Sequence, residues 1–322
     1  MGLSVQFEPA RSYAKNVVFI DGITRSGKFW MVHFLYQIEN IEHVRHDPTM
    51  DHVAVASFFK MIGDNVAISL LQGMLNRQLY ENLIGRNLNF RYADSSSVLK
   101  NPDLQKYLMR VIGPDRDPQE TFSELKESNN WFVFLVHDWL SHLKIQLEAF
   151  PAMKLIRVER NLIDLVYAWY SKGIGRDRMA FGIRIKSNYG SVPWFAFPWL
   201  DSFDSLCEMD RIILSILTLH QKAKETYETL SISHKKQVLF TSYEEMAGTP
   251  LDTINDIATF LGTSVRDSVW TFIEEKVFRE RNRSNLTASR EVKKQFIQER
   301  ASHEVFSRLE DSVTKYENSQ LS

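Results

Sequence analysis

Four short stretches of the chain are apolar at nearly every position, and each is followed by a polar turn and a longer segment with helical spacing. Continuous rather than alternating hydrophobicity is typical of strands that are buried on both faces. A repeated order of strand, turn and helix predicts a parallel sheet covered by helices. The predicted strands are Val17–Ile20, Trp131–Val136, Lys154–Val158 and Gln237–Phe240.

The segments between these strands predict helices of different character. Lys28–Asn40 is apolar nearly all round, so we expect it to be buried, whereas Asn65–Ile84 carries apolar residues at helical spacing. Thr249–Gly262 begins with Thr-Pro and ends in glycine, which are common start and stop signals of helices. Ser289–Glu317 is charged and amphipathic, as expected of a helix packed on the outside. The pattern therefore predicts an α/β fold with three αβα layers and a central, mainly parallel sheet, in one domain spanning residues 1–322.

The regular pattern breaks down at about residues 173–205, where glycines, prolines, basic residues and aromatic residues are mixed. Long irregular segments in compact domains are usually lids or binding loops, so we expect a lid or acceptor-binding segment here. The alternative is that its aromatic side chains form only a satellite core. These side chains are Trp194, Phe195, Phe197 and Trp199.

Composition narrows the class of protein. The 322 residues carry a net charge of −1, so no global field attracts nucleic acid or an anionic membrane. A single cysteine, Cys207, excludes an internal disulfide and a cysteine-rich metal site, and fits a reducing compartment. No signal-peptide core is recognisable, and no apolar run reaches the ~20 residues of a membrane span. We therefore expect a cytoplasmic protein without a nucleic-acid partner or a membrane span; the oligomeric state stays open, with a homodimer as one option.

The segment Gly22–Lys28, GITRSGK, has the spacing G-x-x-x-x-G-K between a predicted buried strand and a predicted helix. In such a loop, backbone N–H groups and the helix dipole converge on an anion, so the sequence predicts a phosphate-binding loop. The next residue is Phe29, where a nucleotide-hydrolysing loop carries the Ser or Thr that holds magnesium. This loop therefore argues against a magnesium-dependent nucleoside triphosphatase.

Thr24–Trp30, TRSGKFW, resembles the 5′-phosphosulfate loop of PAPS-dependent sulfotransferases, P-[KR]-S-G-T-[TS]-[WLF]. That family has a P-loop-like fold, binds PAPS (3′-phosphoadenosine 5′-phosphosulfate) and requires no metal for the transfer. The resemblance implies that Arg25 is the catalytic basic residue and that Trp30 stacks on adenine. The cofactor-binding residues that it implies in this loop are Arg25, Ser26, Gly27, Lys28, Phe29 and Trp30.

Lys154–Ser171 resembles the 3′-phosphate motif of the same family, a strand ending in R-[ND]-P-x-D before a helix with an early serine. Arg160 can hold a phosphate through two hydrogen bonds, although alone it would more often form a structural ion pair. Ala168 occupies the position of the family's serine, and we expect Ser171, one turn later, to supply the hydroxyl. The matching residues are Arg160, Asn161 and Asp164, while Leu162 replaces the proline.

Two C-terminal segments extend the resemblance. Gln237–Gly262 is similar to the family's strand-YEDM-helix-FLG segment, which implies that Tyr243 lies near the adenine. The basic stretch Arg279–Arg290 stands where family members close a basic loop over the 3′-phosphate, and this implies roles for Arg281 and Arg283. A solvated run of charge is the alternative for that stretch.

His137 directly follows the predicted strand Trp131–Val136. Ligands of open α/β sheets bind beyond the carboxyl ends of the strands, and histidine suits proton abstraction near neutral pH. Cytosolic sulfotransferases carry a catalytic histidine in a K-x-H stretch at this point, although the lysine is Leu135 here. We therefore expect His137 to be the general base, with Arg25 and Lys28 stabilising charge. A structural histidine is the alternative, and His142 and Asp94 are the other candidate bases.

The resemblance implies transfer of a sulfuryl group from PAPS to a hydroxyl or amine of a small-molecule or carbohydrate acceptor. One rival is a P-loop kinase or NTPase that uses Lys28 and Mg-ATP, with Asp138 near the metal. Another is a non-catalytic, nucleotide-binding homologue. The acceptor stays open: the aromatic residues of the irregular segment suit a phenol or a sugar face, whereas its basic residues suit an anionic acceptor. These basic residues are Arg176, Arg178, Arg184 and Lys186.

Overall fold

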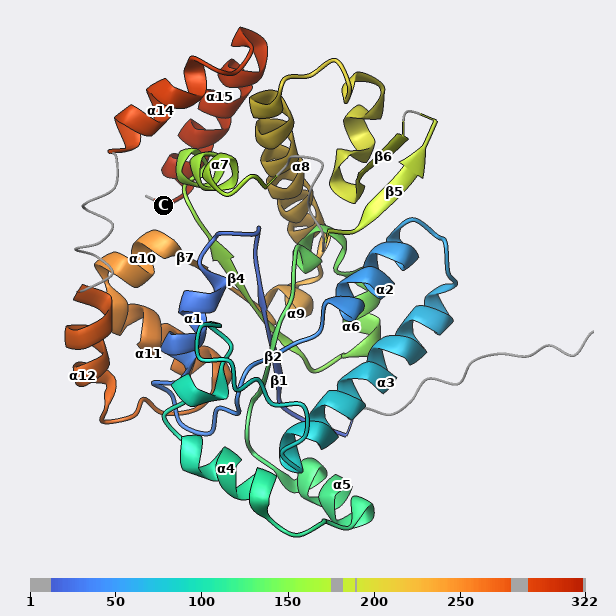
Figure 1. Ribbon diagram of the computed structural model, residues 1–322, viewed down its shortest axis with the longest axis vertical. Helices are drawn as coiled ribbons and strands as arrows, with labels where there is room; N and C mark the ends of the chain where they lie inside the picture. Colours follow the sequence, from blue (N-terminus) through green and yellow to red (C-terminus); the bar gives the residue numbers. More distant parts are fainter. Residues whose placement is uncertain (1–12, 175–181, 189, 279–288, 321–322) are drawn as a thin grey trace, which may run out of the picture.

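A computed structural model describes residues 13–174, 182–188, 190–278 and 289–320. Its centre is a five-stranded sheet in the order β2-β3-β1-β4-β7, in which every neighbouring pair is parallel (Figure 1). The predicted parallel sheet is confirmed, and β2 is a short edge strand that the pattern did not indicate. The strands are β1 (Val17–Asp21), β2 (Arg45–His46), β3 (Phe132–Leu135), β4 (Lys154–Glu159) and β7 (Val238–Ser242).

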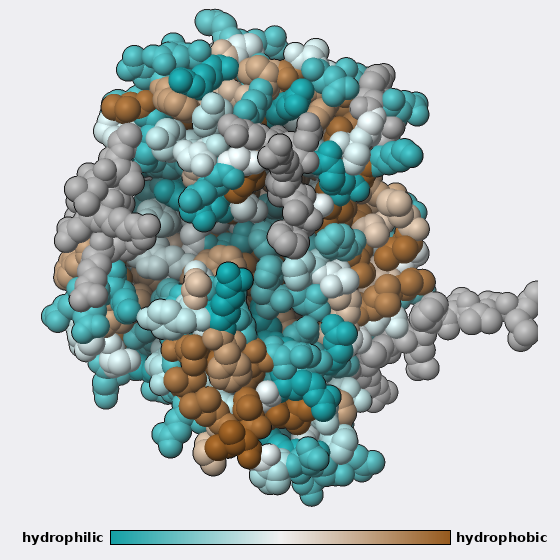
Figure 2. Space-filling view, in the orientation of Figure 1, coloured by the Kyte–Doolittle hydropathy of each residue, from teal (hydrophilic) through white to brown (hydrophobic). Residues whose placement is uncertain are grey.

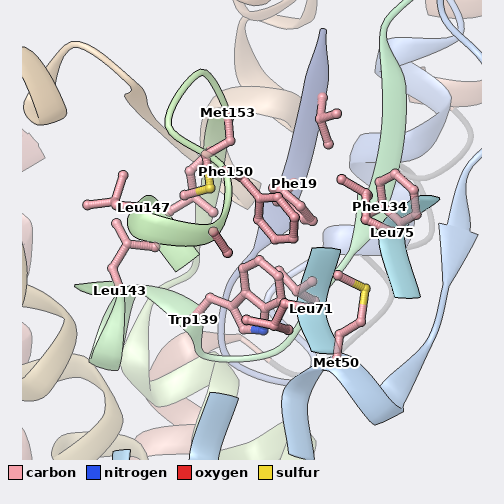
Figure 3. Packing of buried hydrophobic residues seen from close by; sticks show 14 of the residues in the cluster. Phe19, Met50, Leu71, Leu75, Phe134, Trp139, Leu143, Leu147, Phe150 and Met153 are labelled. Carbon is pink, nitrogen blue, oxygen red and sulfur yellow. The ribbon is translucent and has the colours of Figure 1, made fainter. Parts of the chain in front are cut away.

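Alternating side chains of β1 enter two separate cores, because successive residues of a strand point to opposite faces. Phe19 packs with Trp139 and Phe150 in the first core (Figure 3). Val18 and Ile20 belong to the second core. Helices cover both faces, which gives the three layers. The helices of the first face are α2 (Pro48–Phe58), α3 (Asp64–Leu83), α6 (Lys144–Ala149) and the 3-10 helix η2 (Trp139–His142); those of the second are α1 (Lys28–Leu35), α11 (Pro250–Leu261), α12 (Val269–Phe272) and the π-helix η4 (Ile273–Val277).

A third apolar cluster lies beyond the carboxyl ends of the strands, where α7 and α8 pack together at the top of Figure 1. Trp169 of α7 and Ile213 of α8 are almost fully buried in it. The described part of the irregular segment joins this cluster through Trp194 and Phe195, whereas Phe197 is exposed. The elements here are α7 (Leu162–Ser171), α8 (Glu208–Thr229), α14 (Arg290–Gln298), α15 (His303–Gln320), the hairpin strands β5 (Arg184–Ser187) and β6 (Gly190–Pro193), and the 3-10 helix η3 (Trp194–Ser202).

Two predicted helices have different limits from those expected. The helix from Lys28 ends at Leu35 rather than Asn40, because the chain turns there and then forms isolated β-bridges from Ile38 and Ile41. The predicted helix over residues 289–317 is two helices, α14 and α15, separated by a break at residues 299–302. Such contacts between distant segments override local helical pattern.

The opposite end of the molecule holds α4, which exposes Leu108, Met109, Val111 and Ile112 and contributes to the apolar patch low in Figure 2. Among the described helices, none combines the length and apolar character of a membrane span. The remaining elements are η1 (Val98–Lys100), α4 (Leu104–Ile112), α5 (Pro118–Glu127), α9 (Ile232–Lys235) and α10 (Tyr243–Gly248).

Candidate functional site

The loop after β1 has a backbone that requires glycine at two positions. Gly22 has φ 149°, and a Cβ there would collide with the carbonyl oxygen of Val158. Gly27 has φ 113°, and a Cβ would lie 3.0 Å from the Tyr243 ring. Arg25 also adopts a left-handed conformation, with φ 74°. Residues with a side chain rarely adopt these positive φ angles. The G-x-x-x-x-G spacing therefore reflects a tight turn that connects β1 to the N-terminus of α1.

A cleft of about 580 Å³ opens beside this turn, at the carboxyl ends of the strands. It brings together most of the residues singled out in the sequence, from four separate segments. Ser26 does not line the cleft: it is buried, and its hydroxyl has no hydrogen-bond partner among the described residues. Arg281 and Arg283 lie outside the described residues. The predicted residues that line the cleft are Arg25, Gly27, Lys28, Phe29, Trp30, His137, Arg160, Ala168, Ser171 and Tyr243.

Aromatic rings and a guanidinium form one wall of the cleft. The rings of Trp30 and Tyr243 have centroids 4.9 Å apart, and the Arg160 guanidinium carbon lies 4.4 Å from the Tyr243 centroid. Arg160 also donates from Nη1 to the carbonyl oxygen of Arg25 at 3.1 Å, whereas its buried Nε has no partner among the described residues. Arg160 is therefore fixed beside the loop, and it lines the cleft.

A second basic group, Lys293 of α14, reaches the same cleft. Its Nζ lies 2.5 Å from a carboxylate oxygen of Asp164 on α7, and Arg290 approaches the same carboxylate at 3.3 Å. Lys293 belongs to none of the motifs recognised in the sequence. No local signal marks it, because its partner lies 129 residues away in the chain.

Lys28 points inward from the loop. Its Nζ donates to the carbonyl oxygen of Gly22, and the residue is buried. Burial lowers the pKa of Lys28, while the nearby carboxylates of Asp138 and Asp21 oppose that shift. Asp21 is itself held by Arg157 at 2.9 Å and by the backbone N–H groups of η2. The ammonium group of Lys28 thus lies within a buried charge network at the floor of the cleft.

His137 is held by Asp51, a residue that the sequence analysis missed. The backbone N–H of His137 donates to Oδ1 of Asp51 at 3.2 Å, and Nδ1 lies 3.1 Å from Oδ2. Trp139 Nε1 donates to the same carboxylate at 2.7 Å. Burial, followed by the charge of Lys28, lowers the pKa of His137 to about 3, so the imidazole is neutral near pH 7. A proton on Nδ1, shared with Asp51, leaves Nε2 as the acceptor.

His137 also lines a second cavity, of about 490 Å³, and so joins the two spaces. The walls of the second cavity are largely apolar, and its described lining includes no lysine or arginine. The other candidate bases, His142 and Asp94, line neither cavity: His142 is buried against Gln146, and Asp94 pairs with Arg91. The lining of the second cavity is Thr24, His46, Pro48, Asp51, His52, His137, Asp138, Trp169, Gly182, Ile183, Trp194 and Phe195.

One comparison with known protein families matches nearly the whole chain. The sequence pattern described as a sulfotransferase domain matches residues 15–317. No curated protein matches the chain. Among solved structures, the sulfotransferase domain of the Synechococcus PCC 7002 olefin synthase is 13% identical, with a TM-score of 0.40, over 82% of this chain and 80% of that one. A sulfotransferase from Alicyclobacillus acidocaldarius is 16% identical, with a TM-score of 0.39, over 80% of this chain and 85% of that one. A mouse sulfotransferase complexed with PAP is 17% identical, with a TM-score of 0.36, over 87% of this chain and 69% of that one. Because the family match extends over nearly the whole chain, the protein belongs to the sulfotransferase-domain family.

Proposed function

We propose that the protein transfers a sulfuryl group from PAPS to the hydroxyl of a small, largely apolar acceptor, with His137 as general base, in one domain. The position of His137 between two cavities carries this proposal. One cavity offers a phosphate-type loop and arginines, and the other offers an apolar chamber. A base that faces both spaces can take a proton from an acceptor as that acceptor attacks a group held on the other side.

The first cleft suits a nucleotide with two phosphate groups at separate positions. The loop from Arg25 to Lys28 suits the phosphosulfate, because helix N-termini and basic groups stabilise anions. Arg160 suits the 3′-phosphate because its side chain lines the cleft beside the loop, and Lys293 adds a second cation nearby. The Ser171 hydroxyl donates to the Tyr167 carbonyl at 2.8 Å, and it lines the cleft beside Ala168. The rings of Trp30 and Tyr243 provide an apolar wall for the adenine.

The proposed reaction is an in-line transfer. The acceptor oxygen forms a bond to sulfur while the bond between sulfur and the phosphate oxygen breaks, and PAP leaves. His137 Nε2 takes the acceptor proton, and Asp51 stabilises the resulting imidazolium. Arg25 and Lys28 stabilise the negative charge that develops on the transferred group and on the leaving phosphate. No step requires a metal ion.

The lining of the second cavity favours an apolar acceptor over an acidic glycan. Trp169, Trp194 and Phe195 supply flat apolar surface, which suits an aromatic or alicyclic ring. Arg184 and Lys186 do not line this cavity, and Arg184 bonds to Ser191 across the hairpin. Arg176 and Arg178 lie outside the described residues. A phenol or a hydroxylated ring therefore fits best.

Calorimetric titration with PAP in EDTA tests the proposal, with AMP as the matched ligand that lacks the 3′-phosphate and with ATP plus magnesium as a second control. We expect PAP binding that persists in EDTA and is at least about tenfold tighter than AMP binding, since hydrogen bonds to charged groups contribute roughly 1.5–3 kcal/mol each. Binding of ATP only with magnesium, and none of PAP, would instead support the kinase reading.

Labelled PAPS then tests the acceptor, with 4-nitrophenol compared against a neutral and an acidic oligosaccharide. Transfer to the phenol at least tenfold faster than to either sugar supports the apolar acceptor. Transfer to the acidic oligosaccharide alone would contradict it. Tight PAP binding without transfer to any hydroxyl would favour the non-catalytic homologue.

A further inference from the structure

Three side chains of types that can bind a metal ion lie together in the wall of the second cavity: His46, Asp51 and His137. One ligand atom from each lies within 4.8 Å of the others. The sheet explains why the two histidines meet. His46 pairs with Leu135 in the parallel register of β2 and β3, so His137, two residues further on, emerges at the same edge. Two imidazoles and a carboxylate form a donor set typical of zinc and related divalent metals.

The distances between the ligand atoms of the three side chains suit one shared ion if the His46 ring moves slightly closer. The Nδ1 of His137 and the Oδ2 of Asp51 are 3.1 Å apart. Two ligands of a tetrahedral zinc are roughly 3.3–3.6 Å apart, given bonds of about 2.0–2.2 Å. His46 completes the set only if its ring moves closer. That ring is exposed, and no hydrogen bond to it occurs among the described residues; its neighbours are the rings of Phe29 and His137.

The surroundings set both the coordination and the strength of such a site. The three side chains line the cavity of about 490 Å³, so a fourth ligand can come from water or from an acceptor hydroxyl. Asp51 is anchored by Trp139 and therefore offers a fixed oxygen. Lys28 carries a positive charge nearby, and this opposes metal binding. We therefore expect an affinity in the micromolar range, well below that of structural zinc sites.

We propose that His46, Asp51 and His137 bind one divalent transition-metal ion, such as Zn²⁺, and that the bound ion switches off His137 as a base. A neutral imidazole has a single nitrogen with a free lone pair. A metal ion uses that lone pair whichever nitrogen it occupies, so His137 can no longer accept a proton. The site is inhibitory, and this part of the inference rests on the proposed role of His137.

Titration of the metal-free protein with Zn²⁺ by calorimetry, and with Co²⁺ by visible absorption, tests the site without any substrate. We expect one ion per chain, and at least about tenfold weaker binding in His46→Ala and in Asp51→Asn, because even the loss of a group that only supports a metal ligand costs about 10–100-fold in affinity. His52→Ala is the matched control. His52 lines the same cavity, but its Nδ1 lies 2.8 Å from the carbonyl oxygen of Pro48 and it is not part of the cluster. Its variant should bind within about twofold of the parent.

The absence of saturable binding up to about 1 mM, or an equal loss in His52→Ala and His46→Ala, would overturn the metal site. His46 is exposed, so its variant should fold even if Asp51→Asn does not. PAP titration is a separate readout: failure of PAP to bind would refute the proposed function and leave the metal site standing. If transfer is found, Zn²⁺ should abolish it and EDTA should restore it. Unimpaired transfer with the site loaded would refute the inhibitory role.

Discussion

The buried carboxylate of Glu42 should be a main determinant of stability, although it lines neither of the two cavities. It is fully buried and accepts hydrogen bonds from five side chains. These partners connect α3, α4 and the segment before β3, so one carboxylate joins three parts of the region over residues 41–130. The donors are Lys106 at 2.7 Å, Arg110 at 2.8 and 3.0 Å, Tyr107 at 3.0 Å, Asn82 at 3.1 Å and Asn130 at 2.9 Å.

The expected effect of Glu42→Gln follows from the pKa. Burial alone would raise the pKa of Glu42, but Arg110 and then Lys106 outweigh it and lower the pKa to about 2. The difference between the ordinary pKa of 4.5 and a pKa of about 2 corresponds to about 3 kcal/mol of stability at pH 7. Breaking a buried ion pair by removing one partner typically costs about 3–5 kcal/mol, which agrees. We therefore expect Glu42→Gln to lower the free energy of unfolding by about 3 kcal/mol.

The pH dependence has a defined sign. Because the folded pKa is depressed, the contribution is complete above pH 4.5 and is lost as the pH falls towards 2. The difference between parent and Glu42→Gln should shrink from about 3 kcal/mol at pH 7 to about 2 kcal/mol at pH 3.5. Urea unfolding at the two pH values measures it. Glu148→Gln is the matched control, since the exposed pair of Glu148 with Lys144 should contribute less than about 1 kcal/mol.

If the free energy of unfolding of Glu42→Gln at pH 7 lies within about 1 kcal/mol of the parent's, the reasoning is refuted. A difference that grows as the pH falls would also refute it, because that sign would mean that the carboxylate is destabilised in the folded state.

Three further predictions concern the proposed cofactor cleft. Arg160→Ala should weaken PAP binding by about 10–100-fold and AMP binding by less than threefold in calorimetry, because the proposed role of Arg160 is to hold the 3′-phosphate that AMP lacks; equal losses for PAP and AMP would contradict that role. Arg25→Ala should lower the turnover of labelled PAPS by at least about tenfold while PAP affinity changes little, since in the proposed reaction the Arg25 charge acts on the transferred group; unchanged turnover would contradict the proposed catalytic role. Gly27→Ala should destabilise the fold by about 1–3 kcal/mol in thermal unfolding and weaken PAP binding, because φ is 113° and the Tyr243 ring is adjacent; a variant as stable as the parent would contradict this.

The sequence by itself determined the parallel sheet, the loop after its first strand and the position of His137 at a strand end. These features are local, because a buried strand, a glycine turn and a helix start are each specified by a few consecutive residues. Parallel strands also align their carboxyl ends, so residues that follow different strands were expected to meet. The cleft does contain the loop, Arg160 and His137 together. The assignment of roles to them stays a prediction.

Only the tertiary structure decided which side chains support these residues. Asp51 reaches His137 across 86 positions, and Lys293 reaches Asp164 across 129. It also decided that Lys28 turns inward and that the first helix stops at Leu35. Contacts of this kind depend on how α2 and α14 pack against the sheet and α7, and that packing depends on the summed fit of many apolar side chains. No short segment of sequence encodes such a fit.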